Sequence, residues 1–185
     1  LRPASDPERD GDPQPGVDFG LVYDRARRRL VQFGGISSNV GGSSQLHGET
    51  WESDGDSWEL RHTATQGGPE PRYAAAMAHR ASTGKTLLFG GVSASRILGD
   101  LWEWDGTAWT QLCPSASPST ICASLPAARW GASLAFDAAR DRLVLFGGVL
   151  DGTSDASNEL WEFDGAAWTR RCDGVKESCA ATPPG

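Results

Sequence analysis

The sequence lacks long hydrophobic runs and carries little positive charge. No stretch approaches the ~20 consecutive apolar residues that a membrane-spanning helix needs, so no membrane insertion is expected. The first fifteen residues are polar rather than signal-like, which places any export signal outside this chain. Nucleic-acid binding relies on a basic surface, so a net charge of −7 argues against nucleic acid as a partner. The arginine-rich stretch 25–29 is interpreted as a solvated hairpin tip.

Motifs of catalysis and of metal or phosphate binding are also missing. The sequence contains no Gly-x-Ser-x-Gly elbow, no histidine pair at metal-binding spacing and no phosphate-binding glycine loop. The acidic stretch 151–159 lacks the Asp-x-Asp-x-Asp-Gly spacing of a calcium loop. We therefore predict no catalytic residue, no metal site and no cofactor.

Cysteine is scarce, and its four copies form two close pairs, Cys113 with Cys122 and Cys172 with Cys179. Neither pair shows the Cys-x-x-Cys spacing or the nearby histidine of a zinc site. Two local disulfides are the preferred interpretation. They imply an oxidising compartment, and we expect an extracellular, periplasmic or cell-surface location.

Tryptophan is abundant, and six of the eight copies belong to a motif that occurs three times. This repeat motif is an apolar run ending in Phe-Gly-Gly, a variable loop, a Trp, six residues and a second Trp. Its phenylalanines, Phe33, Phe89 and Phe146, lie 56 and 57 residues apart, a period typical of repeat architectures. The tryptophan pairs are Trp51 and Trp58, Trp102 and Trp109, and Trp161 and Trp168.

Each repeat predicts four strands separated by turn signals. The first strand is rich in small residues, the second is the apolar run, and the third and fourth carry the two tryptophans. Asp-Gly separates the third strand from the fourth in every repeat, which predicts a two-residue type I′ hairpin turn. The expected first strands are 20–23, 74–79 and 131–136, and in the second of these His79 is interpreted as a packing ring.

Gly-Gly followed by two aromatic residues with six residues between them resembles the kelch repeat, with Trp where that family often has Tyr. The resemblance covers about residues 16–171. It implies an all-β fold, a β-propeller segment of three four-stranded antiparallel kelch-type blades at about 16–60, 71–111 and 127–171. The small-residue strand would be innermost. Residues 1–15 and 172–185 would be connections between blades.

Three blades are too few for a closed ring, because propellers close with about four to eight blades. The chain is therefore expected to be a partial ring that belongs to a larger propeller, or half of a six-bladed assembly of two copies. Its expected partners include the remaining blades or a second copy of the chain.

The long loops should share one face, because the chain runs up and down within each blade, and long loops on a rigid scaffold usually carry binding. In this face Arg72-Tyr73 and Arg129-Trp130 stand at equal positions, while Gly16-Val17 replaces them in the first repeat. The arginines either bind loop carbonyls between blades or line a pocket for an anionic or carbohydrate ligand. The candidate ligand-binding residues are Arg72, Tyr73, Arg129, Trp130, Arg96, His47 and Asp151.

The leading functional hypothesis is a non-catalytic extracellular binding module for a protein or a carbohydrate. The alternatives are a fragment of a secreted carbohydrate oxidase or lyase with its catalytic residues on other blades, and a structural spacer in a surface protein. A copper radical oxidase needs a tyrosine cross-linked to cysteine, and here only Tyr23 and Tyr73 exist while all four cysteines are expected to be paired.

Overall fold

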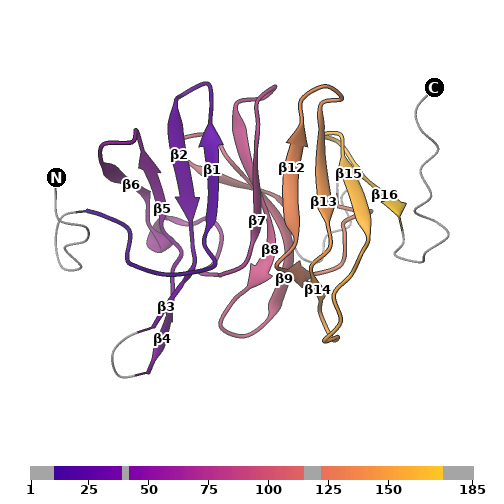
Figure 1. Cartoon of the computed structure of the whole chain (residues 1–185), viewed down its shortest axis with the longest axis horizontal. Helices are drawn as coiled ribbons and strands as arrows, with labels where there is room; N and C mark the ends of the chain where they lie inside the picture. The colour runs from indigo at the N-terminus through magenta and orange to yellow at the C-terminus, as the bar shows by residue number, and fades with distance from the viewer. Residues whose placement is uncertain (1–10, 39–41, 115–121, 173–185) are drawn as a thin grey trace.

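The computed structural model describes residues 11–38, 42–114 and 122–172. These residues form an all-β structure with three four-stranded antiparallel sheets, each with its strands in chain order (Figure 1). No helix among the described residues has the length and apolarity to cross a membrane.

The first sheet contains β1 (Gly20–Asp24), β2 (Arg29–Phe33), β5 (Thr50–Ser53) and β6 (Trp58–His62). The second contains β7 (Ala76–Arg80), β8 (Lys85–Val92), β9 (Ile97–Trp104) and β10 (Trp109–Cys113). The third contains β12 (Ser133–Asp137), β13 (Arg142–Phe146), β15 (Leu160–Phe163) and β16 (Trp168–Cys172). The shorter elements are β3 (Ile36–Ser38), β4 (Ser44–Leu46), β11 (Arg129–Trp130), β14 (Val149–Leu150) and the 3₁₀ turn η1 (Ala64–Gln66).

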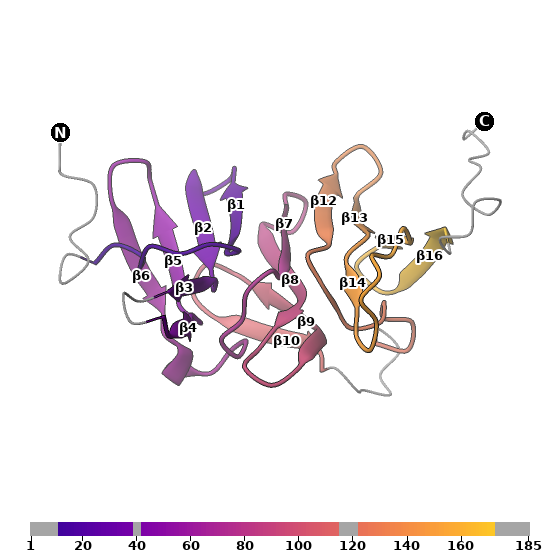
Figure 2. The ribbon, with the colours of Figure 1, turned by 60° about the horizontal axis from the view of Figure 1, so that its bottom comes forward.

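The sheets stand side by side and approach one another at their first strands. Strand β7 lies between β1 and β12, and the three sheets follow one another along the long axis of the molecule (Figures 1 and 2). The four strands expected in each repeat are therefore confirmed. The three described sheets do not close into a ring.

Aromatic packing joins each sheet to the next. Phe33 of the first sheet meets Trp109 of the second edge-on, with ring centroids 5.2 Å apart, and Phe89 meets Trp168 of the third at 5.8 Å. Phe33 and Phe89 are both almost completely buried. The phenylalanine of one repeat motif thus packs on the second tryptophan of the following motif. The aromatic residues of the repeat motif therefore form the contact between successive sheets.

The two outer sides of the stack expose the side chains that the inner contacts would bury. On the outer side of the first sheet, the N-terminal flank, Leu21 and Tyr23 are 48% and 53% exposed. On the outer side of the third sheet, the C-terminal flank, Phe146 is 51% exposed, whereas the equivalent Phe89 is buried. The flanks are apolar surfaces for which the described residues supply no cover.

The Asp-Gly turns differ from the expected type I′ geometry. Strands β9 and β10 pair Trp104 with Trp109, so the loop has four residues, and of its Asp-Gly pair only Gly106 has a positive φ. Asp105 instead accepts hydrogen bonds from the backbone N–H groups of Thr107 and Ala108 at 2.8 and 2.9 Å. The type I′ prediction was wrong because the aspartate side chain organises the loop. The Thr107 hydroxyl and these N–H groups lower the pKa of Asp105.

A chain of backbone hydrogen bonds also links the sheets just before their first strands. The Ala74 N–H donates to the Asp18 carbonyl at 2.8 Å, and the Gly131 N–H donates to the Ala74 carbonyl at 2.9 Å. All three residues adopt left-handed backbone conformations, with φ of 56°, 52° and 66° in chain order. The contact imposes a conformation that favours glycine, yet only the third repeat has one.

We expect Ala74→Gly to raise the free energy of unfolding and Gly131→Ala to lower it, each by about 1 kcal/mol. A Cβ atom at Gly131 would meet nothing within 4 Å, so its effect isolates the backbone conformation. Urea denaturation measures both changes. Ala75→Gly, which has no positive φ to relieve, is the control and should be destabilising. Equal losses for Ala74→Gly and Ala75→Gly would contradict the explanation.

Candidate binding face

The long loops project from one side of the stack. In Figure 1 the β3–β4 hairpin, the β8–β9 loop and the segment around β14 lie at the bottom, and the β1–β2, β7–β8 and β12–β13 tips lie at the top. The first of these sides is called the loop-rich face below. All seven candidate residues come from the connections on this face, and one of them, Arg96, lies in the β8–β9 loop.

Arg72 is 1% exposed, and its guanidinium donates hydrogen bonds mainly to residues of the second sheet. Its two terminal nitrogens bind the Asp100 carboxylate at 2.6 and 2.8 Å. Nη1 also donates to the Gly90 carbonyl at 2.9 Å, and Nε donates to the Glu70 carbonyl at 3.1 Å. A ligand on the surface therefore finds no free guanidinium at this position.

Arg129 repeats the arrangement in the third sheet and is also 1% exposed. It donates to the Gly147 carbonyl at 3.0 Å, the Ala127 carbonyl at 3.0 Å and the Glu159 carboxylate at 2.6 Å. Burial alone would raise the pKa of Glu159, but hydrogen bonds from Arg129 and from the indole of Trp161 outweigh it and lower the pKa. The pair is a charged contact inside the protein.

The backbone of Arg72 contacts the preceding sheet. Its carbonyl accepts from the Gly35 N–H at 2.9 Å, and its N–H donates to the His47 carbonyl at 3.1 Å. The residue thus holds the loop of one sheet with its backbone and the loop of the next with its side chain. The sequence allowed two roles for these arginines, binding loop carbonyls between blades or lining a ligand pocket. The observed contacts are those of the first role.

The other candidate residues are spread over the face. Tyr73 and Trp130 are half-buried and pair through their backbones with Val92 and Val149. Arg96 is exposed and forms a 2.7 Å ion pair with Glu70, while Asp151 is exposed beside β14. His47 lies at the first sheet, where its carbonyl binds the Arg72 N–H while its ring contacts Ser37 and Glu49. The structure therefore does not gather the seven residues into one site.

A pocket of about 290 Å³ lies where the first sheet meets the loop-rich face, and His47 is the only one of the seven candidates that lines it. The His47 ring is held by the Ser37 hydroxyl at 2.7 Å from Nε2, with Glu49 at 3.7 Å from Nδ1. The sequence reasoning missed the other polar lining residues. They come from separate segments: Gln14, Gln32, Gln45, Glu49 and Thr63.

The opposite side carries a second set of contacts between sheets. The guanidinium of Arg27, held by Asp24 at 2.5 Å and Glu52 at 2.7 Å, lies over Gly106 of the second sheet. Arg80 likewise lies over Gly165 of the third sheet. The solvated-tip interpretation of residues 25–29 therefore fails for Arg27.

Arg80 also forms a 2.7 Å ion pair with Asp141 across the boundary between the second and third sheets. Hydrogen bonds from Arg80 and from the Ser82 hydroxyl lower the pKa of Asp141 to about 2. The carboxylate is therefore charged at every pH at which the protein would ordinarily be handled.

His79 lies between the first and second sheets. Its Nε2 is 3.4 Å from the Asp24 carboxylate, and its Nδ1 is 3.3 Å from the Thr86 hydroxyl. Burial lowers the pKa of His79 despite the attraction of Asp24, which keeps the ring neutral near pH 7. These contacts agree with the interpretation of His79 as a packing ring. Within the described part of the chain, no three His, Cys, Asp or Glu side chains are grouped to hold a metal.

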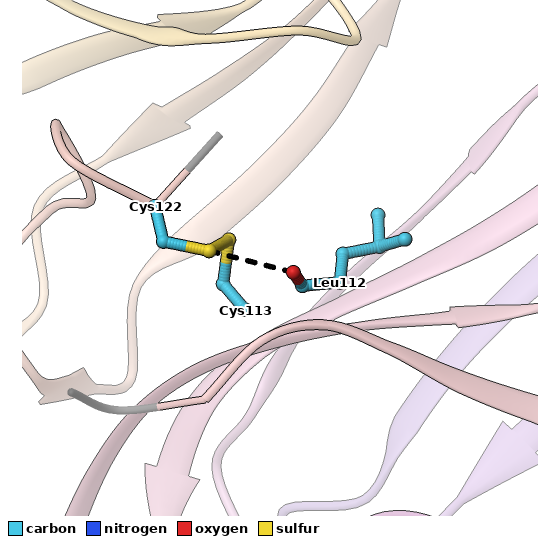
Figure 3. The surroundings of a disulfide bond; sticks show 3 residues. All are labelled: Leu112, Cys113 and Cys122. Carbon is cyan, nitrogen blue, oxygen red and sulfur yellow. Dashed lines mark hydrogen bonds between the residues drawn. A yellow bond between two sulfur atoms is a disulfide. The ribbon is translucent and has the colours of Figure 1, made fainter. Parts of the chain in front are cut away.

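The Cys113–Cys122 disulfide is confirmed (Figure 3). It closes part of the connection between β10 and β11. The Cα atoms are 5.4 Å apart, and the Cys122 Sγ lies 3.4 Å from the Leu112 carbonyl oxygen. Both cysteines are buried in the core between the second and third sheets. Cys179 lies outside the described residues, so its pairing with Cys172 stays a prediction.

Comparison with known proteins adds no relative. No protein-family model matches this chain, and no curated protein does. The kelch resemblance therefore depends on the repeat motif alone, and the geometry above is what supports a function.

We expect Arg129→Met to lower the free energy of unfolding by about 3 kcal/mol, because it leaves the Glu159 charge without its buried partner. Arg170→Met is the matched control. Arg170 binds the same carboxylate at 3.4 Å but is half exposed, so its loss should cost less than about 1 kcal/mol. Chemical denaturation measures both variants. Similar losses would show that burial does not distinguish the two contacts.

Proposed function

We propose that this chain is part of an extracellular kelch-type β-propeller that binds a protein or a carbohydrate through its loop-rich face and has no catalysis of its own. The observation that carries the proposal is the repetition of one interface between successive sheets. The Phe–Trp contact occurs at both boundaries, and so do the backbone link before the first strands and the guanidinium over the Asp-Gly turn.

The same repetition supports further blades or a second copy beyond the three sheets. Phe146 stands on the C-terminal flank without the tryptophan that Phe89 has. A Cβ at Gly55 of the first sheet would meet nothing within 4 Å, whereas Gly106 and Gly165 lie under arginines. The interface between successive sheets occurs twice inside the chain. The C-terminal flank presents one side of that interface and the N-terminal flank presents the other, so the two flanks are complementary surfaces.

Binding through the loop-rich face is supported by how its loops are anchored. Buried Arg72 and Arg129 fix the loop bases from within, and the Cys113–Cys122 disulfide ties one connection to the core. Half-buried Tyr73 and Trp130 stand on this scaffold, and aromatic side chains supply much of the binding energy in interfaces. The disulfide also supports an oxidising, extracellular location.

Peptide and glycan arrays probed with the protein test the function. We expect Trp130→Ala to weaken a specific signal by about 2 kcal/mol, the usual loss at a binding hot spot. Asp164→Ala, in a turn on the opposite side, should leave the signal unchanged. Arrays without a specific signal, or equal losses for the two variants, would overturn the proposed function.

We expect the three-sheet chain to self-associate with increasing concentration, because its flanks leave apolar sheet surface in water. Phe146→Asp should shift the equilibrium toward the monomer by charging the C-terminal flank. Ala166→Asp adds the same charge in an exposed turn and is the control. Sedimentation velocity measures the distribution, and a monomer at every concentration would show that three sheets shield their own flanks.

A further inference from the structure

The first sheet lacks the arginine that holds the other two. Arg72 and Arg129 each precede the phenylalanine of their repeat motif by seventeen residues, and the residue at this position in the first repeat is Gly16. The backbone pairing agrees with this alignment. Val17 bridges to Ile36 as Tyr73 bridges to Val92, and Trp130 pairs likewise with Val149. Gly16 therefore occupies the place of the arginine.

Three residues accept hydrogen bonds from the arginine in the second and third sheets, and the first repeat has a counterpart of each. In the second sheet the guanidinium binds Gly90, Glu70 and Asp100, and in the third it binds Gly147, Ala127 and Glu159. The equivalent residues of the first sheet are Gly34, Gln14 and Glu49. All three line the 290 Å³ pocket beside His47. The pocket is therefore lined by the counterparts of the residues that bind the arginine in the other two sheets.

One lining residue of the pocket is polar where the other two sheets have leucine. Gln32 lines it and is 7% exposed, and no hydrogen bond joins its amide to another described residue. Its equivalents, Leu88 and Leu145, are buried leucines. Trp51 also lines the pocket, and its equivalents Trp102 and Trp161 donate to the acids that bind arginine, at 2.7 and 3.2 Å. Gln32 and Trp51 thus add polar groups to the pocket that Glu49 lines.

We infer that this pocket binds the guanidinium of an arginine side chain presented by another polypeptide. A guanidinium is planar and carries five donors in a fixed fork, which matches carbonyls and a carboxylate that already bind one in two equivalent places. The volume is at the lower end of the range for small-molecule pockets, roughly 300–1,000 Å³. The inference deepens the proposed function, on which it rests, by naming the group that a protein partner offers.

N-acetyl-L-arginine amide, titrated into the protein and followed by NMR, tests the inference. Saturable shifts are expected for Gly34 and for the Trp51 indole, with no comparable response to the citrulline or lysine analogues. Equal binding of the lysine analogue would overturn the inference, because a point charge does not need the fork. Titration at several protein concentrations separates binding from self-association.

Two variants locate the response. Glu49→Gln should weaken binding about tenfold, since it removes the charge from the central acceptor. Glu59→Gln is the matched control, because Glu59 lies on the same sheet, is exposed and pairs with Arg61. Gln32→Leu should weaken binding while preserving the fold, since leucine stands at the equivalent positions. Unchanged affinity in Glu49→Gln would overturn the inference.

The outcomes also separate the two proposals. No arginine response, with a specific array signal that Trp130→Ala weakens, would overturn the arginine pocket alone. Failure of both measurements would overturn the proposed function as well. An arginine response that Glu49→Gln weakens, together with array signals from arginine-containing peptides, supports both.

Discussion

No sheet in this protein can bury its own apolar side chains, so each depends on contact with the next. The strands have at most eight residues, and an isolated four-stranded sheet leaves both of its faces in water. Phe33 on Trp109 and Phe89 on Trp168 remove those faces from water in pairs. The contacts of Arg27 and Arg80 follow from this stacking, because each is built where one sheet meets the next.

The strands were predictable because their signals are local. An apolar run that ends at Phe-Gly-Gly and an Asp-Gly between two tryptophan-bearing segments are visible within a few residues, and they recur in phase. The turn geometry was not predictable from the same letters. Both a type I′ turn and a loop closed by the aspartate carboxylate use Asp-Gly, and only the backbone conformation of Asp105 distinguishes them.

The site was predicted less well, because exposure and pairing are not local properties. Arg72 and its partner Asp100 are 28 residues apart, with two strands and a loop of variable length between them. Nothing in the sequence near Arg72 therefore shows that its charge is buried and neutralised. Arg27 presents the reverse case. Four arginines within five residues suggest a solvated tip, but Asp24 and Glu52 hold one of them against the neighbouring sheet. In contrast, the absence of arginine at position 16 was visible in the alignment of the repeats, and its meaning required the acceptors around Arg72.

The guanidinium groups over Gly106 and Gly165 have a consequence for how such a chain can be altered or diversify. Arg27 sits in the β1–β2 loop, whereas Arg80 is the last residue of β7, so the two groups reach equivalent places from different positions in their repeats. A side chain on either glycine would displace the neighbouring guanidinium, in addition to the strain imposed by the positive φ of the glycine itself. A repeat therefore cannot be exchanged on its own. The loop between the first two strands of one sheet and the Asp-Gly turn of the next sheet form a matched pair. Recombination that exchanges one without the other would leave a clash or a gap at the boundary between the two sheets.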